Sequence, residues 1–269
     1  MTSDRGRPST PHFGEEDAKL SYGSYLAVDE LLRLQRLESD PPAHDELLFI
    51  VVHQVYELWF KLCLFELEAA RDAMFGGDVP FARHLLNRVH SIEKVLIEQI
   101  GVLEAMAPID FLEFRQNLAP ASGFQSVQFR EIEFLSGLKN AAYIDRLSTD
   151  EDEGDRLRRR LREPSLWDAF CHVLTARGLP MPAGDEEVRR TSLKTLLAQV
   201  DARPEEFYLS ESLLTHDELF AKWRYHHVLM VERQIGSKTG TGGSTGASYL
   251  RTTLDKRFYP ELWAARSFL

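Results

Sequence analysis

Apolar residues recur every three or four positions over most of this chain, the spacing that places them on one face of an α-helix. A first helix is predicted over residues 20–37, where the pattern stops at a pair of prolines. A second is predicted over residues 44–75, between an acidic first turn and two glycines. Because its start is apolar nearly all round, we expect it in the centre of the protein, with other helices covering every side.

The same spacing predicts helices through the rest of the chain, separated by proline and glycine residues. They cover residues 79–106, 109–118 and 124–135, a segment with Pro164 in its first turn, residues 204–215, residues 217–235 and a segment from Tyr249. No segment has the alternation of a strand. The predicted fold class is therefore all-α: a single-domain helical bundle with long central helices over residues 16–269, after a disordered tail at residues 1–15.

The composition is that of an ordinary globular protein, since 43% hydrophobic residues in a chain of 269 allow one large core. The start of the chain is polar, which argues against a signal peptide, and no later segment is expected to span a membrane. Cys63 and Cys171 are far apart in the sequence and have no metal ligands beside them. Neither a disulfide framework nor a zinc site is indicated, and a reducing cytoplasm is the expected location.

The formal net charge is −10, which argues against nucleic acid as a partner because phosphate binding requires clustered Lys and Arg. One basic cluster, Arg156 to Arg162, directly follows the acidic run Asp150 to Asp155. We expect these two runs to screen each other on a solvated surface.

Three histidines and one arginine are candidates for chemistry. His53 shares a helical face with Phe49, so it is predicted to be buried, where an imidazole needs a hydrogen-bond partner but need not have a further role. His226 and His227 lie on two neighbouring apolar stripes of one predicted helix, and spacing does not decide which of them is functional. Arg115 is expected in a salt bridge unless a planar anion requires it.

The glycine-rich loop at residues 240–246 does not match a nucleotide-binding motif. A P-loop needs Lys after its last Gly, where Ala247 stands, and a dinucleotide fingerprint needs a preceding strand. A flexible connection between helices is the plain alternative. The loop does offer backbone N–H groups and the Thr241 hydroxyl near a helix start, which is a favourable place for a carboxylate.

Several blocks of sequence, in one order over about residues 20 to 263, resemble the tryptophan 2,3-dioxygenase family. In the first half they are Tyr22-Gly23-Ser24-Tyr25-Leu26, His44-Asp45-Glu46, Phe49-Ile50-Val51-Val52-His53-Gln54, Glu57-Leu58-Trp59-Phe60-Lys61 and Phe111-Leu112-Glu113-Phe114-Arg115. In the second half they are Pro120-Ala121-Ser122-Gly123-Phe124-Gln125-Ser126, Trp223-Arg224-Tyr225-His226-His227 and Gly240-Thr241-Gly242-Gly243-Ser244. The chain departs from many relatives at Thr245 and Ala247, and residues 147–203 match weakly.

The resemblance implies a heme b cofactor buried between the helices, with an iron held by one histidine. His227 matches the family's proximal heme ligand, which leaves the opposite face of the iron open for oxygen. His53 matches the distal histidine, expected to accept a hydrogen bond from the indole N–H and to orient the ring. Ser122 is expected beside the heme and the substrate.

The resemblance also implies the remaining substrate contacts. Arg115 matches the residue that pairs with the substrate carboxylate, and Thr241 is expected to hold the ammonium and carboxylate groups. Phe49 and Phe111 match the aromatic walls of the pocket. Tyr22 and Leu26 match residues that the family lends to a neighbouring subunit's pocket, so a homotetramer is expected.

The reaction implied by the resemblance is cleavage of the indole C2–C3 bond of L-tryptophan by molecular oxygen, giving N-formylkynurenine with both oxygen atoms retained. One alternative is a heme-dependent monooxygenase acting on tryptophan or β-methyltryptophan in a natural-product pathway. Another is a non-catalytic heme sensor or carrier, which would have no need for Arg115 and Thr241 together. A purely structural helical bundle would bind no heme at all.

Overall fold

The computed structural model describes residues 20–147, 151–243 and 245–268. The disordered tail expected at residues 1–15 lies outside the described residues. The chain divides into two units, Met1–Leu37 and Glu38–Leu269, which we describe separately.

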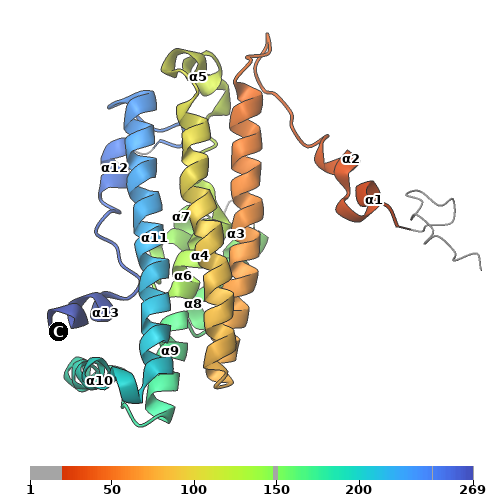
Figure 1. Ribbon diagram of the computed structural model, residues 1–269. Coiled ribbons are helices and arrows are strands. Elements are labelled where there is room, and N and C mark those ends of the chain that lie inside the picture. Colours follow the sequence, from red (N-terminus) through yellow and green to blue (C-terminus); the bar gives the residue numbers. More distant parts are fainter. Residues whose placement is uncertain (1–19, 148–150, 244, 269) are drawn as a thin grey trace, which may run out of the picture. The chain divides into compact units, whose positions relative to one another are not determined.

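The described part of the first unit contains two short helices, α1 (Tyr22–Leu26) and α2 (Val28–Leu31), in place of the single helix predicted over residues 20–37 (Figure 1). Ala27 separates them in a left-handed conformation, with φ of 49°. Tyr22 is 80% exposed and Leu26 is exposed as well. A long regular helix here would need its apolar side to be packed, and neither α1 nor α2 has a buried residue to stabilise it.

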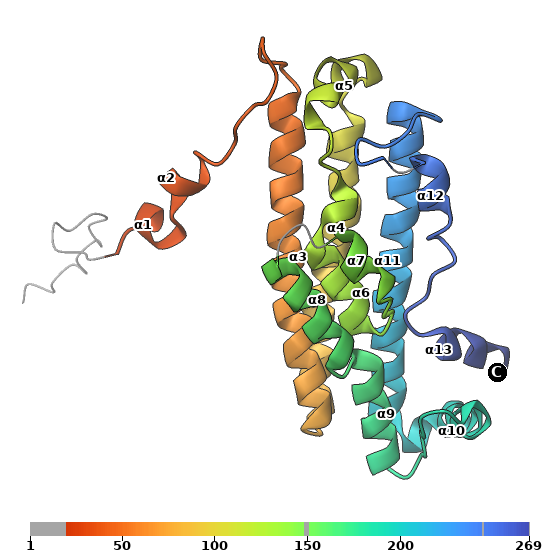
Figure 2. The same cartoon turned by 180° about the vertical axis from the view of Figure 1, so that it is seen from behind.

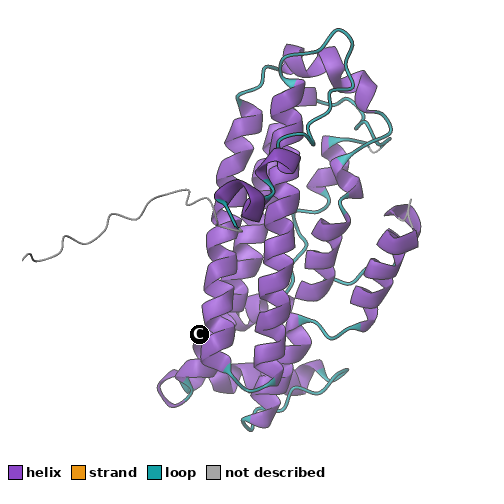
Figure 3. Ribbon diagram, turned by 90° about the vertical axis from the view of Figure 1, so that its right-hand side faces the viewer, coloured by secondary structure: helices purple, strands orange, loops and turns teal. Residues whose placement is uncertain are grey.

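The second unit is built on three long helices that lie side by side, α3 (Glu46–Phe75), α4 (Val79–Glu104) and α11 (Pro204–Ile235) (Figures 1 and 3). The most extensive packing is that of α4 against both α3 and α11. Fully buried leucines on each helix, Leu67, Leu86 and Leu209, contribute to the main core. The positions that gave these segments their helical spacing are therefore the positions that pack together.

Shorter helices surround this centre (Figure 2). They are α5 (Pro108–Phe114), η1 (Arg115–Leu118), η2 (Gly123–Gln125), α6 (Val127–Ser136), α7 (Ala142–Leu147), α8 (Glu151–Arg162), α9 (Leu166–Ala176), α10 (Glu186–Ala198), η3 (Val200–Ala202), α12 (Ala247–Arg251), α13 (Pro260–Ala265) and η4 (Arg266–Phe268). Both α6 and α9 pack on α3, and α8 packs on α6. The described residues contain no strand, and the predicted all-α fold class is confirmed.

The break predicted near Thr215 is wrong, because α11 runs without interruption from Pro204 to Ile235. The Thr215 hydroxyl donates to Glu211 O, 2.8 Å away in the preceding turn, so its polar group is satisfied inside the helix. Asp217 does not begin a helix. Its buried carboxylate accepts hydrogen bonds from the backbone N–H groups of Phe258 and Tyr259, at 2.9 and 3.1 Å.

Pro164 also acts differently from the prediction, which placed it in the first turn of a helix. Pro164 precedes α9, whose N-cap is Ser165, and the Ser165 hydroxyl accepts from the Asp168 N–H in a capping box. Pro260 begins α13 at its first position, where the missing N–H costs no helical hydrogen bond.

Contrary to the prediction, the helices in the described part of the chain leave one face of α3 uncovered. Leu47, Val51, Leu58 and Phe65 recur at helical spacing and are exposed, Phe65 by 69%. The expectation that no segment could span a membrane was also wrong on length and composition alone, because α3 meets both criteria. The opposite face of α3 packs on α4, α6 and α9.

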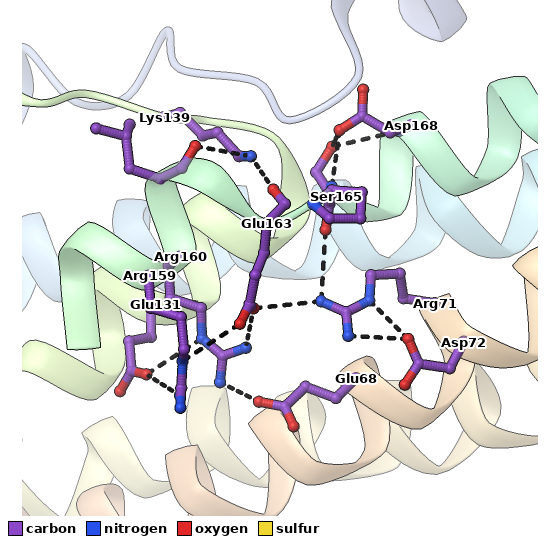
Figure 4. A network of polar contacts seen from close by, with 12 residues as sticks. Glu68, Arg71, Asp72, Glu131, Lys139, Arg159, Arg160, Glu163, Ser165 and Asp168 are labelled. Atoms are coloured by element: carbon purple, nitrogen blue, oxygen red, sulfur yellow. Dashed lines mark hydrogen bonds and ion pairs between the residues drawn. The ribbon is translucent and has the colours of Figure 1, made fainter. Parts of the chain in front are cut away.

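The basic cluster on α8 is only in part the solvated surface that we expected, because Arg158, Arg159 and Arg162 are exposed whereas Arg160 is buried. Arg160 is only 4% exposed, and its guanidinium contacts Glu68 on α3, Glu131 on α6 and Glu163 (Figure 4). The Arg160 Nε to Glu131 Oε1 distance is 3.2 Å, and Arg156 pairs with the other oxygen of Glu131. We call these five residues the α8 ion network. The Arg158–Asp155 pair, at 2.5 Å, joins the two runs on the surface as predicted.

Candidate active site

The second unit encloses a cavity of ≈ 260 Å³ between α3, α5, α6 and α11, with the glycine-rich loop along one edge. Aromatic and aliphatic side chains make up most of its wall, including Phe49 and Phe111, whose ring centroids are 5.6 Å apart and nearly parallel. A largely apolar cavity with a few polar groups is the usual form of a site for a small molecule or cofactor.

From α3, His53 contributes an imidazole to this cavity. Its Nδ1 is 2.7 Å from Phe49 O, and because a carbonyl only accepts, Nδ1 must carry the hydrogen. Burial lowers the pKa of His53, which favours the neutral ring. In the neutral ring Nε2 is then a hydrogen-bond acceptor, and the side chain is at the cavity wall.

From α11, His227 contributes a second imidazole to the same cavity. Burial lowers the pKa of His227 to about 4, so this ring is neutral as well. Neither of its nitrogens has a hydrogen bond within the described residues. The ring stacks on Trp223, with centroids 5.0 Å apart and planes 7° apart. His226 is exposed and absent from the cavity wall, so of the two histidines that spacing left open it is His227 that lines the cavity.

Arg115 and Thr241 lie at the edge of the cavity, where they hold the glycine-rich loop in place. Arg115 makes no ion pair within the described chain, and its guanidinium instead donates to Thr239 O. The Thr241 hydroxyl donates to Ala121 O at 2.6 Å. Arg115 is therefore not the salt-bridge residue that its isolated position suggested.

The loop and the segment before α6 approach each other closely at Ser122. A Cβ at Gly242 would lie 2.6 Å from the Cβ of Ser122, a distance that real Cβ atoms do not tolerate. Ser122 also lines the cavity and caps η2. Glycine at position 242 is thus required for the loop to reach the cavity edge.

The sequence did not single out Arg130, Glu133 and Tyr249, which also line the cavity. Arg130 and Glu133 are three residues apart on α6, a spacing that in the sequence indicates no more than a surface pair. Arg224 lines the cavity too and was present in one of the motifs, but without a role.

Two of the predicted site residues, Tyr22 and Leu26, belong to the first unit. The other predicted residues, Phe49, His53, Phe111, Arg115, Ser122, His227 and Thr241, all line the cavity.

Comparison with known proteins identifies the family. The family model described as tryptophan 2,3-dioxygenase matches residues 8–185 and 191–269, which includes most of the region where the resemblance was weakest. A protein of Nocardioides sp. named tryptophan 2,3-dioxygenase is 58% identical over 262 residues, covering 96% of this chain and 97% of its own. Proteins of that name from Herpetosiphon aurantiacus and Serratia proteamaculans are 46% and 41% identical over 260 residues, each covering 93% of this chain and 98% and 93% of their own. The chain belongs to the tryptophan 2,3-dioxygenase family.

Proposed function

We propose that this protein is a heme-dependent tryptophan 2,3-dioxygenase, which cleaves the indole C2–C3 bond of L-tryptophan with molecular oxygen and forms N-formylkynurenine. The observation that carries the proposal is the pair of neutral histidines, His53 and His227, that line one apolar cavity from different helices. Arg115 and Thr241, at the edge of the same cavity, provide the polar groups that an amino acid requires.

The residues of the cavity fit a heme. An imidazole without a protein partner is available to hold an iron, and His227 would be such a group because burial keeps it neutral and its nitrogens make no hydrogen bond within the described chain. The wall around it is aromatic, and its ring is held in plane by Trp223. His227 would hold the iron, with Ser122 beside the group. The chemistry that heme supplies when bound is activation of molecular oxygen at the position that a single histidine leaves open.

His53 positions the indole. Since its Nδ1 hydrogen is held by Phe49 O, its Nε2 accepts the hydrogen bond of the indole N–H and fixes the orientation of the ring. Phe49 and Phe111 enclose the ring and exclude water, which supplies most of the buried apolar area of the complex. His53 acts as a positioning group in this proposal, and it takes no proton.

Arg115 and Thr241 bind the amino-acid part of the substrate. The planar guanidinium suits a carboxylate, and Arg115 has no competing ion pair in the described chain. The Thr241 hydroxyl provides a hydrogen bond to the ammonium or carboxylate group. The Thr241 hydroxyl has one hydrogen and must leave Ala121 O before it donates to the substrate, whereas Arg115 contacts Thr239 O through one guanidinium nitrogen and has further N–H donors.

The proposal includes a homotetramer in the cytoplasm. Tyr22 and Leu26 would complete the pocket of a neighbouring subunit, and the exposure of both side chains supports this role. The uncovered apolar face of α3 supports assembly as well, because an apolar surface of this kind is stabilised when a partner covers it.

Mass spectrometry of the product under isotopically labelled oxygen tests the proposed activity. The reduced, heme-loaded protein is mixed with L-tryptophan and, separately, with β-methyltryptophan. Two labelled atoms in a ring-opened product of L-tryptophan are expected. One labelled atom, chiefly with the methylated substrate, would instead establish the monooxygenase, and no product from either substrate would favour the heme sensor.

Two variants test the residue roles. His227→Ala is expected to lose heme, because no other cavity histidine is placed to hold the iron from α11. Arg115→Leu is expected to retain heme and to bind tryptophan more weakly by about 2–5 kcal/mol, since it leaves a carboxylate unpaired. Full heme content in the first variant, or unchanged tryptophan affinity in the second, contradicts the respective assignment.

A further inference from the structure

One end of the cavity is lined by charged side chains that the proposed mechanism does not use. Arg130 and Glu133 come from α6, and Arg224 comes from α11. All three are buried, with exposed fractions of 6%, 1% and 3%. We call Arg130, Glu133 and Arg224, together with the neighbouring Lys256 and Tyr249, the cationic end of the cavity.

The positive charge here exceeds the negative charge. Glu133 is the carboxylate that both guanidinium groups share, at 2.7 Å from Arg130 Nη1 and 2.9 Å from Arg224 Nη2. Asp217 also lies near Arg224, but one of its oxygens is occupied by N–H groups of the segment that leads into α13. Burial lowers the pKa of Arg224 in spite of these carboxylates, which is the sign of a cation that its surroundings stabilise incompletely.

Two arginine N–H donors at the cationic end also have no hydrogen-bond acceptor within the described residues. The Nε atoms of Arg130 and Arg224 are buried and have no hydrogen-bond partner in the described chain. A buried donor without a partner is destabilising, so its presence beside a cavity indicates a missing acceptor. The Arg130 guanidinium is meanwhile held by the rings of Phe124 and Tyr143, at 5.0 and 4.2 Å. The donors are thus fixed in position before any ligand binds.

Lys256 and Tyr249, near the arginines, add an ammonium group and a hydroxyl group to the cationic end. The Lys256 ammonium donates to the Tyr143 hydroxyl at 2.8 Å, and burial lowers the pKa of Lys256. The Tyr143 and Tyr249 hydroxyls are 3.4 Å apart, and Tyr249 reaches the cavity wall. The Tyr249 hydroxyl at the cavity wall is therefore linked through Tyr143 to the ammonium group of Lys256, the third cation of this region.

The position of this end relative to His227 defines what it can contact. Arg224 is three residues before His227 on α11, about one helical turn, or roughly 4.5 Å along the helix axis. If His227 holds a large planar group, one edge of that group would therefore reach the cationic end of the cavity. Heme carries carboxylates on one edge, and a guanidinium binds a carboxylate better than it binds water alone.

We propose that the cationic end of the cavity binds a carboxylate side chain of heme, with Arg130 and Tyr249 as direct contacts and Arg224 and Lys256 as the charge behind them. This inference rests on the proposed function, because it requires heme on His227. It differs from the role given to Arg115, which binds the carboxylate of the amino acid at the loop edge.

The test compares hemin with hemin dimethyl ester, in which both carboxylates are blocked. The full-length protein is loaded with either compound, without tryptophan, and the rate of transfer to excess apomyoglobin is measured from the Soret band. The unmodified protein is expected to lose the diester about 10 to 100 times faster than hemin, the range that corresponds to one charge-assisted hydrogen bond. Arg130→Gln is expected to lose hemin as fast as it loses the diester, with diester loss unchanged.

Control variants separate this role from general stability. Arg160→Gln removes an equally buried arginine from the α8 ion network, away from the cavity wall, and is expected to keep the full preference for hemin. Arg130→Lys keeps the charge and is expected to recover part of the preference. Tyr249→Phe, at a half-buried position, tests the second direct contact even if Arg130 variants fold poorly, and about a threefold to tenfold loss for hemin alone is expected.

Equal loss of hemin and diester from the unmodified protein overturns the inference. So does an Arg130→Gln or Tyr249→Phe variant that loses both compounds faster by the same factor. A change in tryptophan affinity with no change in hemin retention would assign the cationic end to the substrate's carboxylate instead. Failure of the unmodified protein to retain either compound would refute the proposed function itself, so the two failures are distinguishable.

Discussion

Two ionic regions are built on the same short helix, α6, and they differ in how completely their charges are matched. In the α8 ion network, all three side-chain nitrogens of Arg160 have a carboxylate partner, on Glu68, Glu131 and Glu163. At the cationic end of the cavity, two arginines share Glu133, and an Nε of each is left without a partner. Burial of charge is common to both regions, and only the unmatched region borders a cavity. Buried charge by itself therefore does not mark a binding site, and at α6 it is the unsatisfied donors beside the cavity that set the cationic end apart.

Of the changes that test this comparison, Glu133→Gln is expected to lower the free energy of unfolding most. Without its carboxylate, Arg130 and Arg224 become buried cations that lack a charged partner, and the heme-free protein should lose about 3–5 kcal/mol in free energy of unfolding. Bound hemin would restore an anion, so the loss should be smaller by about 1.5–3 kcal/mol in the heme-loaded protein. Urea unfolding of both forms measures it. An equal loss in the two forms would show that no heme carboxylate reaches these arginines.

A smaller effect is expected in the matched region, from Glu131→Gln. This change leaves Arg160 with Glu68 and Glu163, so the loss should be near the lower end of the range for a broken buried pair, about 3 kcal/mol. Hemin should not alter this loss, because no residue of the α8 ion network lines the cavity. The same unfolding experiment applies, and a loss that hemin relieves would mean that the two regions are coupled.

The smallest effect is expected from protonation of His90, which adds a charge at a buried position that is neutral at pH 7. His90 is buried, donates from Nε2 to Ser212 O at 2.9 Å, and has its pKa lowered to about 4 by burial and by the charge of His216. Its folded pKa lies below the unfolded value of about 6.5, so the unfolded chain binds more protons at intermediate pH. Stability contributed by neutral His90 is present above pH 6.5 and is lost as the pH falls toward 4.

Between pH 7 and pH 5 this loss amounts to about 2 kcal/mol. His90→Gln keeps an N–H donor without the titration, so its free energy of unfolding should change less over the same interval, by that amount. The difference between the two proteins in urea unfolding at both pH values isolates His90 from other titrating groups. Parallel changes in the two proteins would show that His90 is protonated without a penalty.

The sequence predicted the long helices well because their apolar residues keep a regular spacing over many turns, as Leu67, Leu86 and Leu209 do. It failed at Thr215 because polar residues there resemble a helix start. The structure shows that His216 contacts Ser136 and Glu93, at 2.8 and 2.6 Å, from distant parts of the chain. Partners separated by 80 or more residues leave no local signal.

The candidate site shows the same limit. His53 and His227 were recoverable from helical spacing together with the family resemblance, whereas spacing alone left His226 equally eligible. Arg130 was missed because its pairing with Glu133 has the spacing of a surface ion pair. What makes Arg130 unusual is a second arginine 94 positions later in the chain, which only the packing of α6 beside α11 brings to the same carboxylate.

The contacts of Arg115 and Thr241 with Thr239 O and Ala121 O have a consequence for how tightly substrate binds. Arg115 keeps further N–H donors, but the one hydroxyl hydrogen of Thr241 is already donated to Ala121 O, so the loop and the incoming amino acid compete for it. Observed affinity is then the intrinsic affinity reduced by the fraction of molecules whose donors are free. A variant in which this hydrogen bond of the empty pocket is stronger would need a higher tryptophan concentration to reach half its maximal rate, even if every contact with the bound amino acid were unchanged.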